Sequence, residues 1–485
     1  MRKIPILVLL AILSCRGVKI KQTSTKPNVL LLYIDDLRPE LASFGAKQII
    51  SPNIDALASK GVKFTNAYSN VPVCGASRAS MLTGMLPTKN RFLDYKTFVE
   101  KEVPKAITLP QLFKNNNYTT ISNGKIYHHL DDKEIDWEEV WRPYAFDENN
   151  KDMAPTDYWQ SLWKDYQTQN NISEYKKTNT GPAFESADVS DFTYIDGLLT
   201  EKVIRDIKKL KKSDKPFFLT AGFISPHLPF NAPKKYWDLY DRSEIKQPEN
   251  YNYTPQDAPE ISISDWAEMR AYSNIPKGPI PDSLALKLIH GYYATVSYTD
   301  ALIGKILNEL KKQDLDKSTI VVFVSDHGYN LQEHTQWAKF TNYNTSTQVP
   351  LIIYNPLSEA NGSTKALIDL VDIYPTLTEI CGLKTPKNQL DGVSLVPILN
   401  NTESKGKEHV LIKRTNGFTL KTREFSYTEF IDPIDNSVIT TMLYDHRTNK
   451  KENINIVDKK EFKKTVLELS STLHSVYKNN IEGIN

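Results

Sequence analysis

Cysteine, net charge and long hydrophobic runs are all scarce in this chain of 485 residues. Its three cysteines are too few for the disulfide framework of small secreted folds. The 60 lysines and arginines balance 58 aspartates and glutamates, so there is no overall basic field and nucleic acid is not an expected partner. With 40% hydrophobic residues the chain can bury a large core, and its length predicts one large domain plus a smaller one.

The apolar stretch near the N-terminus, residues 4–13, is too short to span a membrane as a helix. It follows a short basic start and precedes Ser14-Cys15, which is the layout of a secretory signal, so residues 1–26 are predicted to be a signal peptide region. Cys15 is a candidate lipoprotein acylation site, with cleavage before it, because Ile12-Leu13-Ser14-Cys15 resembles a lipobox. Ordinary signal cleavage nearby is the alternative. We therefore expect an exported protein, in the periplasm or as an outer membrane lipoprotein of a bacterium, with a lipid anchor as its only membrane contact.

Two strand-like segments end in acidic residues. Residues 29–34 and 319–324 are continuous apolar runs, typical of strands buried on both faces of a parallel sheet. The polar residues that follow are Asp35 and Asp36 after the first run, and Ser325, Asp326, His327 and Gly328 after the second. Each aspartate alone could be a turn or helix-cap residue. Because ligands of open α/β sheets bind beyond the carboxyl ends of the strands, we expect the three carboxylates to converge, with a hard cation such as calcium or magnesium offsetting their repulsion.

The pentapeptide Cys74-Gly75-Ala76-Ser77-Arg78 stands before residues 79–84, which read as the first turns of a helix. Taken alone the pentapeptide is a weak signal, since a buried structural cysteine followed by a helix is the ordinary interpretation. Together with the carboxylates at two strand ends, it adds a candidate nucleophile to a candidate metal site.

These residues resemble the type I sulfatases of the alkaline phosphatase superfamily, whose nucleophile is a formylglycine made from the cysteine of a C-x-P/A-x-R signature. The resemblance is strongest to the iduronate-type branch, and runs from residue 28 to about residue 397 and more thinly to the C-terminus. The matching motifs are Asp35-Asp36-Leu37-Arg38-Pro39, Ser51-Pro52-Asn53-Ile54-Asp55, Cys74 to Arg78 with Leu82-Thr83-Gly84, Gly124-Lys125, Pro226-His227, Ser325-Asp326-His327-Gly328, Glu333-His334 and Trp337-Ala338-Lys339. Ala76 stands where the most widely used signature has proline. His327 stands where many sulfatases have asparagine but the iduronate-type branch has histidine.

The resemblance implies an α/β fold of the alkaline phosphatase type, with a large mixed, mostly parallel sheet flanked by helices. Residues 27–400 would form the catalytic sulfatase domain and residues 401–485 a smaller C-terminal α+β subdomain. The sequence of the C-terminal part agrees, because residues 424–430 alternate as a half-buried strand would and residues 437–444 could pair with them in an antiparallel sheet. Residues 460–477 are predicted to be a final helix. Residues 131–190 and 248–281 read as long loops, a kind of segment that often determines specificity.

The resemblance also implies the roles of the site residues. A maturation enzyme would oxidise Cys74 to formylglycine, whose hydrate is the nucleophile. The implied ligands of a Ca²⁺ ion are Asp35, Asp36, the modified Cys74, Asp326 and His327. The cations around the sulfuryl group would be Arg78, Lys125 and Lys339, because its oxygens are negatively charged throughout.

Proton transfer would fall to two histidines, with His227 as general acid on the departing sugar oxygen and His128 assisting the nucleophile. Implied substrate contacts are Lys125, His227, Lys339 and Tyr329. Tyr329 and Phe340 match positions near the sugar, where the iduronate-type branch has tryptophan and tyrosine. His129 and His334 are interpreted as structural or substrate-contacting.

The expected function is a sulfatase that hydrolyses sulfate esters of a sulfated sugar or polysaccharide, acting from the ends of a uronate-containing glycan. Its expected partners are the sulfated carbohydrate and a formylglycine-generating maturation enzyme. One alternative is a phosphoesterase of the same superfamily, but those enzymes usually use serine or threonine as nucleophile and a histidine-rich two-zinc site. The other alternative is a surface lipoprotein that binds glycans without catalysis, which an unmodified Cys74 would favour.

Overall fold

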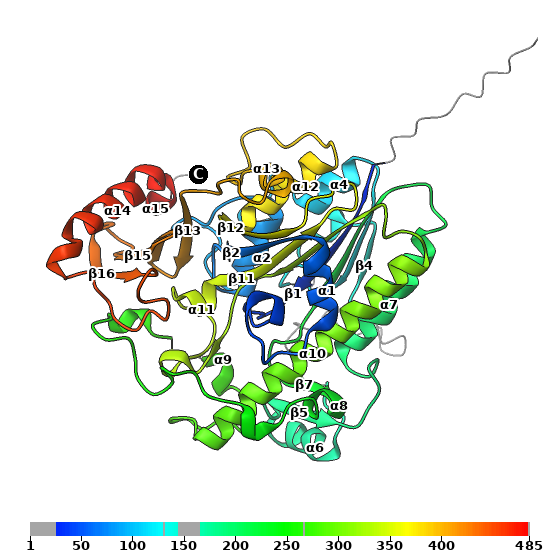
Figure 1. Cartoon of the computed structure of the whole chain (residues 1–485), viewed down its shortest axis with the longest axis horizontal. Helices are drawn as coiled ribbons and strands as arrows, with labels where there is room; N and C mark the ends of the chain where they lie inside the picture. Colours follow the sequence, from blue (N-terminus) through cyan, green and yellow to red (C-terminus); the bar gives the residue numbers. More distant parts are fainter. Residues whose placement is uncertain (1–25, 130, 144–164, 265–266, 484–485) are drawn as a thin grey trace, which may run out of the picture.

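The computed structural model describes residues 26–129, 131–143, 165–264 and 267–483 (Figure 1). The predicted signal region, with Cys15, lies outside the described residues apart from Lys26. In the part of the chain that the structure describes, none of the helices combines the length and the apolar character needed to cross a membrane.

An eight-stranded sheet lies at the centre of the molecule, in the order β12-β2-β11-β8-β1-β6-β3-β4. Its strands are β1 (Asn28–Ile34), β2 (Val62–Tyr68), β3 (Thr119–Gly124), β4 (Glu139–Trp141), β6 (Phe217–Phe223), β8 (Thr319–Ser325), β11 (Gln348–Tyr354) and β12 (Gly362–Asp369). Neighbouring strands are parallel, except that β11 runs antiparallel to both β2 and β8. The prediction of a large mixed, mostly parallel sheet is therefore confirmed.

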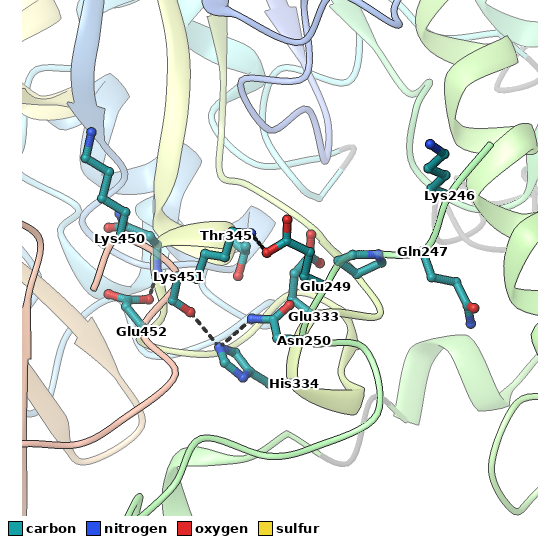
Figure 2. A pocket seen from close by; sticks show the side chains of 12 residues that line it. Lys246, Gln247, Glu249, Asn250, Glu333, His334, Thr345, Lys450, Lys451 and Glu452 are labelled. Atoms are coloured by element: carbon teal, nitrogen blue, oxygen red, sulfur yellow. Dashed lines mark hydrogen bonds and ion pairs between the residues drawn. The ribbon is translucent and has the colours of Figure 1, made fainter. Parts of the chain in front are cut away.

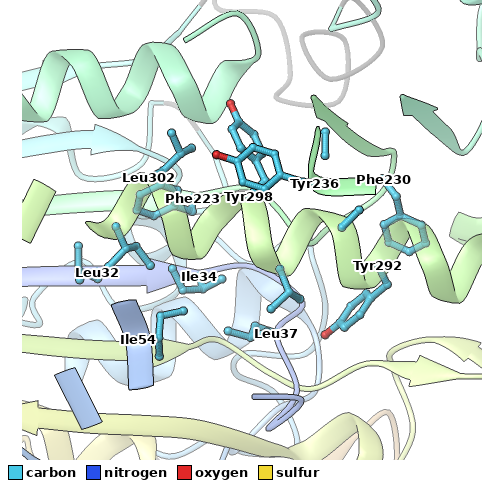
Figure 3. Close-up of a cluster of buried hydrophobic side chains, with 14 of the residues drawn as sticks. Leu32, Ile34, Leu37, Ile54, Phe223, Phe230, Tyr236, Tyr292, Tyr298 and Leu302 are labelled. Atoms are coloured by element: carbon cyan, nitrogen blue, oxygen red, sulfur yellow. The ribbon is translucent and has the colours of Figure 1, made fainter. Parts of the chain in front are cut away.

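Alternate residues of the central strand β1 face two different hydrophobic cores. The first set is Leu30, Leu32 and Ile34, and the second is Val29, Leu31 and Tyr33. The first core is shared with α1 (Pro52–Lys60), α7 (Ile195–Leu210) and α10 (Asp282–Lys312), and part of it is drawn in Figure 3. The second is shared with α2 (Cys74–Thr83), α4 (Leu109–Asn115) and α12 (Ile373–Ile380). Helices therefore cover both faces, which explains why the strand reads as a continuous apolar run.

A separate four-stranded antiparallel sheet lies in the C-terminal part, in orange in Figure 1. Its strands are β13 (His409–Arg414), β14 (Gly417–Thr422), β15 (Phe425–Ile431) and β16 (Val438–Asp445). β15 and β16 are the two strands that the sequence predicts, and they pair as expected. The final helix is also present, as η7 (Lys460–Phe462) and α14 (Lys463–Val476), followed by α15 (Lys478–Glu482), and it packs on this sheet.

The remaining elements are short. They are η1 (Ala42–Phe44), α3 (Val99–Glu102), η2 (Glu134–Asp136), α6 (Gln169–Thr178), β5 (Phe184–Ala187), β7 (Phe230–Pro233), α8 (Lys234–Trp237), η3 (Arg242–Glu244), η4 (Glu260–Ser262), α9 (Ala267–Arg270), β9 (Asn330–Leu331), η5 (Glu333–Thr335), β10 (Trp337–Ala338), α11 (Asn344–Thr347), η6 (Leu370–Asp372) and α13 (Val396–Asn400). Several of them fall within residues 131–190, so the prediction of long loops there is wrong in part. Strands as short as β4 and β5 leave too little periodicity to be found in the sequence.

Candidate active site

Most polar residues of the site follow the ends of four adjacent strands. In the order β8-β1-β6-β3, Ile34 of β1 is level with Ser325 and Phe223, and Gly124 of β3 is level with Gly222. Since these strands are parallel, their carboxyl ends form one edge. The residues that follow each strand there are Asp35 and Asp36 after β1, Lys125 after β3, His227 after β6, and Asp326 and His327 after β8. Convergence of the polar strand ends, predicted from the sequence, is thus present in the structure.

Cys74 reaches the same edge as the first residue of α2. Its Sγ donates to Asp35 Oδ1 at 3.3 Å and lies 3.3 Å from His327 Nε2. The thiol is buried, and burial, with the Asp35 carboxylate adding to it, raises the pKa of Cys74 well above its ordinary value. An unmodified thiol here stays protonated at neutral pH and is a poor nucleophile, because the thiolate is the reactive form.

A compact set of buried ligand atoms surrounds Cys74. Atoms that could coordinate a metal, all within 4.8 Å of one another, come from Asp35, Asp36, Cys74 and His327. Oδ1 of Asp36 is buried, and no described residue shares a hydrogen bond with it. Two carboxylates with such an atom fit a hard cation, for which oxygen ligands are preferred.

Asp326, also predicted as a metal ligand, lies beside this set. Its Oδ1 accepts hydrogen bonds from the backbone N–H groups of Asp36 at 3.2 Å and His327 at 2.9 Å. Its Oδ2 accepts from Arg78 Nε at 2.9 Å. The structure therefore places Asp326 next to the candidate metal ligands, with both oxygens engaged by N–H donors.

Arg78 is fully buried between two carboxylates. Besides Asp326, it faces Asp35, whose Oδ1 lies 3.5 Å from Nη2. The guanidinium also stacks over the Tyr33 ring, 4.4 Å from its centroid, and donates from Nη1 to the carbonyl oxygens of Lys125 and Ile126. Burial alone would lower the pKa of Arg78, but the two carboxylates outweigh it and the pKa is raised.

Two lysines neutralise the paired aspartates, one lysine for each aspartate. Lys125 Nζ forms an ion pair with Asp35 Oδ2, and Lys339 Nζ lies 3.0 Å from Asp36 Oδ2. Both lysines are buried. An anionic group at Cys74 would therefore be close to two fixed cations, which the prediction of cations around a sulfuryl group requires.

The two candidate proton-transfer histidines have pKa values displaced in opposite directions. Burial, with the Lys125 cation adding to it, holds the pKa of His128 well below its ordinary value. At His227, burial and Lys339 act in the same downward direction, but nearby carboxylates, of which Asp36 has the largest effect, outweigh them and raise its pKa. Groups with separated pKa values are suited to serve as base and acid, respectively.

Glu268 of α9 is a member of this group that the sequence did not single out. Its Oε1 lies 2.7 Å from His227 Nε2, and its Oε2 lies 2.7 Å from Lys339 Nζ. Burial alone would raise the pKa of this carboxyl, but the Lys339 and His227 cations hold it well below its usual range. Glu268 belongs to residues 248–281, where the sequence indicates only loops, and no motif points to it.

Tyr95 was also missed, and it lies beside the nucleophile. Its backbone packs directly on the first turn of α2, because a Cβ added at Gly75 would be 2.5 Å from the Tyr95 carbonyl oxygen. Tyr95 as a whole is 47% exposed, and its ring meets the buried His128 ring edge-on, with centroids 6.1 Å apart. An exposed aromatic ring in this place offers an apolar face to a sugar ring. His129 points elsewhere and stacks on Phe98 with a centroid distance of 3.8 Å.

Tyr329 is buried, as the other candidate substrate contacts Lys125, His227 and Lys339 are. Its side chain is fully buried, stacked on Tyr292 at 5.6 Å and edge-on to Phe230 at 6.2 Å. Phe340 is only partly buried, and its N–H donates to the carbonyl of Pro72, two residues before Cys74, at 3.1 Å. Of these two predicted sugar contacts, only Phe340 has exposed surface.

His334 lines a cavity of about 460 Å³, together with residues such as Asn250 and Lys451 (Figure 2). Its Nε2 lies 2.8 Å from the carbonyl oxygen of Lys451 and 3.2 Å from Asn250 Nδ2. None of the candidate catalytic residues named above lines this cavity. These contacts favour the structural interpretation of His334, as a connection between the catalytic part and the C-terminal part.

Comparison with known proteins agrees with this geometry. A family model described as sulfatase matches residues 27–383, and one described as N-sulphoglucosamine sulphohydrolase, C-terminal, matches residues 332–479. Iduronate 2-sulfatase from Mus musculus is 34% identical over 397 residues, which cover 74% of this chain and 69% of that protein.

Two solved structures share the fold. One is a protein in complex with its substrate D-glucosamine-2-N,6-O-disulfate, with a TM-score of 0.73, 21% identity and coverage of 94% of this chain and 98% of that one. The other is a phosphonate monoester hydrolase from Silicibacter pomeroyi, with a TM-score of 0.74, 21% identity and coverage of 94% and 96%. At this identity the likeness concerns the fold alone, which hosts more than one ester chemistry. On the family model and the iduronate 2-sulfatase match, this chain belongs to the sulfatase family and is a sulfuric ester hydrolase.

Proposed function

We propose that the protein removes sulfate from the ends of a uronate-containing glycan, with formylglycine at position 74 and a Ca²⁺ ion. The observation on which this rests is the meeting of Cys74 with Asp35 and His327, each 3.3 Å away, inside a ring of buried cations. The iduronate 2-sulfatase relative supports the choice of a uronate. Deep burial of position 74 supports action on chain ends, because a terminal sugar can reach a buried group more easily than the middle of a chain can.

The calcium ion would be held by Asp35, Asp36, Asp326, His327 and the residue at position 74. When bound, the ion supplies Lewis acidity and lowers the pKa of an oxygen ligand. Formylglycine supplies, through its hydrate, an oxygen nucleophile at a position where the thiol itself would remain protonated. The high pKa of the Cys74 thiol therefore supports the modification.

The protein's own side chains would bind the ester and move its protons. Lys125 and Lys339 would bind the sulfuryl oxygens from two sides, together with the positive N-terminus of α2. His128, kept neutral, would accept a proton from the nucleophile. His227 would donate one to the sugar oxygen as the sulfur–oxygen bond breaks. We also propose that residues 1–26 direct export to the periplasm or outer membrane, with Cys15 as the lipid-anchored residue.

The test of this function is the release of inorganic sulfate from a panel of sulfated oligosaccharides, by protein produced with a formylglycine-generating enzyme. We expect release from uronate 2-sulfates at chain ends, and at least about 100-fold slower cleavage of phosphate and phosphonate esters offered in parallel. Faster cleavage of the phosphorus esters would contradict the proposal and favour the phosphoesterase alternative. Absence of any cleavage, with the aldehyde verified at position 74, would favour the glycan-binding alternative.

Calcium should change the titration of His227 in a direction that the charges determine. In metal-free protein the pKa of His227 is raised. His227 therefore keeps its proton at a pH where an ordinary histidine, with a pKa of 6.5, has already lost it. A divalent cation beside Asp36 would cancel the attraction of that carboxylate for the imidazolium, so adding calcium should lower the pKa. The measurement is an NMR titration of the histidine resonances with and without calcium, with His227 assigned from the spectrum of His227→Gln.

His409 of β13, in the C-terminal sheet, provides the internal control, since its titration should not respond to calcium. A His227 midpoint that calcium leaves unchanged would argue against a metal at Asp35 and Asp36. This readout does not depend on formylglycine or on turnover.

A further inference from the structure

Glu268 reaches the active site from outside the central sheet. It lies on the short helix α9, which packs against β10, the strand immediately before Lys339. Met269 next to it is fully buried in the core. Arg270 ties the other side of the helix down by donating from Nη1 to the carbonyl oxygens of Pro276 at 2.8 Å and Gly278 at 3.2 Å. The Glu268 carboxylate is therefore held in place by its own element.

The carboxylate bridges the two groups proposed to contact the sulfate ester. Its oxygens lie 2.7 Å from His227 Nε2 and 2.7 Å from Lys339 Nζ. The same two nitrogens lie 3.9 Å and 3.0 Å from Asp36 Oδ2. His227 and Lys339 thus stand between two carboxylates, Asp36 on the side of the candidate metal site and Glu268 on the other.

Glu268 is on the solvent side of this pair. Its side chain is 19% exposed, against 6% for Lys339 and none for His227 or Asp36. If a sulfuryl group is bound at position 74 and its leaving oxygen faces His227, the sugar must extend outward past Glu268. The carbon atoms nearest the ester would then pass closest to this carboxylate.

An ionised carboxylate only accepts hydrogen bonds, so it favours neighbouring groups that donate them. A sugar hydroxyl can donate to it, and such a hydrogen bond to a charged group is among the stronger ones. A second sulfate or a carboxylate at the same place would be repelled by the like charge. The uronate carboxyl is compatible only if it points away from Glu268.

We propose that Glu268 accepts a hydrogen bond from a free hydroxyl on the carbon next to the one that bears the sulfate ester. It thereby excludes sugars in which that neighbouring carbon carries a second sulfate. This inference rests on the proposed function, and it adds the substitution pattern of the substrate. The competing explanation is that Glu268 only orients His227 and Lys339.

The experiment compares sulfate release from three substrates by the wild type and Glu268→Gln. The substrates are a monosulfated sugar with a free neighbouring hydroxyl, its analogue with that hydroxyl replaced by hydrogen, and an aryl sulfate. Wild-type kcat/KM should be about 10- to 100-fold higher on the first than on the second, the range expected of a hydrogen bond to a charged group. Glu268→Gln should lose most of this preference, because it should slow the reaction of the first substrate more than that of the other two. Glu268→Asp, which keeps the charge, should recover part of it.

Glu260→Gln is the matched control, because Glu260 is an exposed glutamate in the same loop-rich segment and should leave all three rates unchanged. An equal loss on all three substrates in Glu268→Gln would overturn the inference and leave Glu268 as a positioning residue. A wild type that cleaves the deoxy analogue as fast as the hydroxyl-bearing sugar would overturn it as well, with the proposed sulfatase function intact. No release by the wild type from any of the substrates would instead refute the proposed function, and this inference with it.

Discussion

Cys74→Ala should abolish sulfate release, with a loss of at least about 10⁴-fold in kcat, the scale seen when a nucleophile is removed from a catalytic unit. Alanine cannot be converted to formylglycine, and the two described residues that share hydrogen bonds with Cys74 Sγ, Asp35 and His327, are the proposed metal ligands. The buried cations would remain, so the variant should still bind the sulfated sugar. Sulfate release and substrate binding, measured on the same preparation, separate these two effects.

Cys381→Ala is the control for this experiment. Cys381 is the other buried cysteine among the described residues, and it packs in the second core, away from the strand ends. Its loss removes a small buried group and should cost stability of roughly 1 kcal/mol with activity intact. A Cys74→Ala protein that keeps more than about a tenth of wild-type activity would show that the nucleophile lies elsewhere. Cys74→Ser tests the aldehyde separately, since its single hydroxyl allows attack but not the expulsion of sulfate.

The sequence predicted the site residues best where they directly follow a regular strand. The apolar runs before Asp35 and Asp326 predicted two buried strands, and the rule that ligands bind at the carboxyl ends of parallel strands predicted that these aspartates meet. They do meet, and Cys74 joins them through a helix that begins at the cysteine itself, earlier than the predicted start. The antiparallel direction of β11 could not be predicted, because a strand buried on both faces has the same pattern in either direction.

The residues that the sequence missed lie in irregular segments. Glu268 and Tyr95 stand in no periodic pattern and no motif, and only their packing against β10 and Gly75 shows that they reach the site. For Tyr329, the motif position suggested a sugar contact, and the structure adds that its ring is buried and stacked on Tyr292. Motif matching locates a residue near the reaction centre, whereas the direction of its side chain depends on the packing of distant segments.

The charge balance at the strand ends could be predicted only in part from the sequence. Paired carboxylates suggested a cation between them, and the structure adds that protein cations already partly neutralise the group. Of the paired aspartates, Lys125 contacts Asp35 and Lys339 contacts Asp36, and Arg78 also contacts Asp35. The site is therefore organised before any ion or substrate binds, as electrostatic preorganisation requires.

Arg78→Met should be the most destabilising single substitution proposed for this site. Arg78 has no exposed surface, and two carboxylates, Asp35 and Asp326, depend on it for compensation of their charge. Removing one partner of a buried ion pair costs roughly 3–5 kcal/mol, because the remaining charge stays buried without its partner. Methionine keeps much of the volume, so the loss would be electrostatic rather than due to a cavity. Denaturant unfolding of calcium-loaded protein would measure it.

Comparison with the surface residue Arg447 shows how much of the stability loss in Arg78→Met is due to burial. Arg447 also pairs with two carboxylates, Glu424 at 3.1 Å and Asp445 at 2.7 Å, but its side chain is 51% exposed. Arg447→Met should therefore cost about 1 kcal/mol or less. Arg78→Met should also lower kcat by roughly 10²- to 10³-fold, as expected for loss of a preorganised donor, while Arg447→Met leaves it unchanged. If both variants unfold at the same denaturant concentration, the buried guanidinium does not stabilise the paired aspartates, and the view of a site neutralised by its own cations fails.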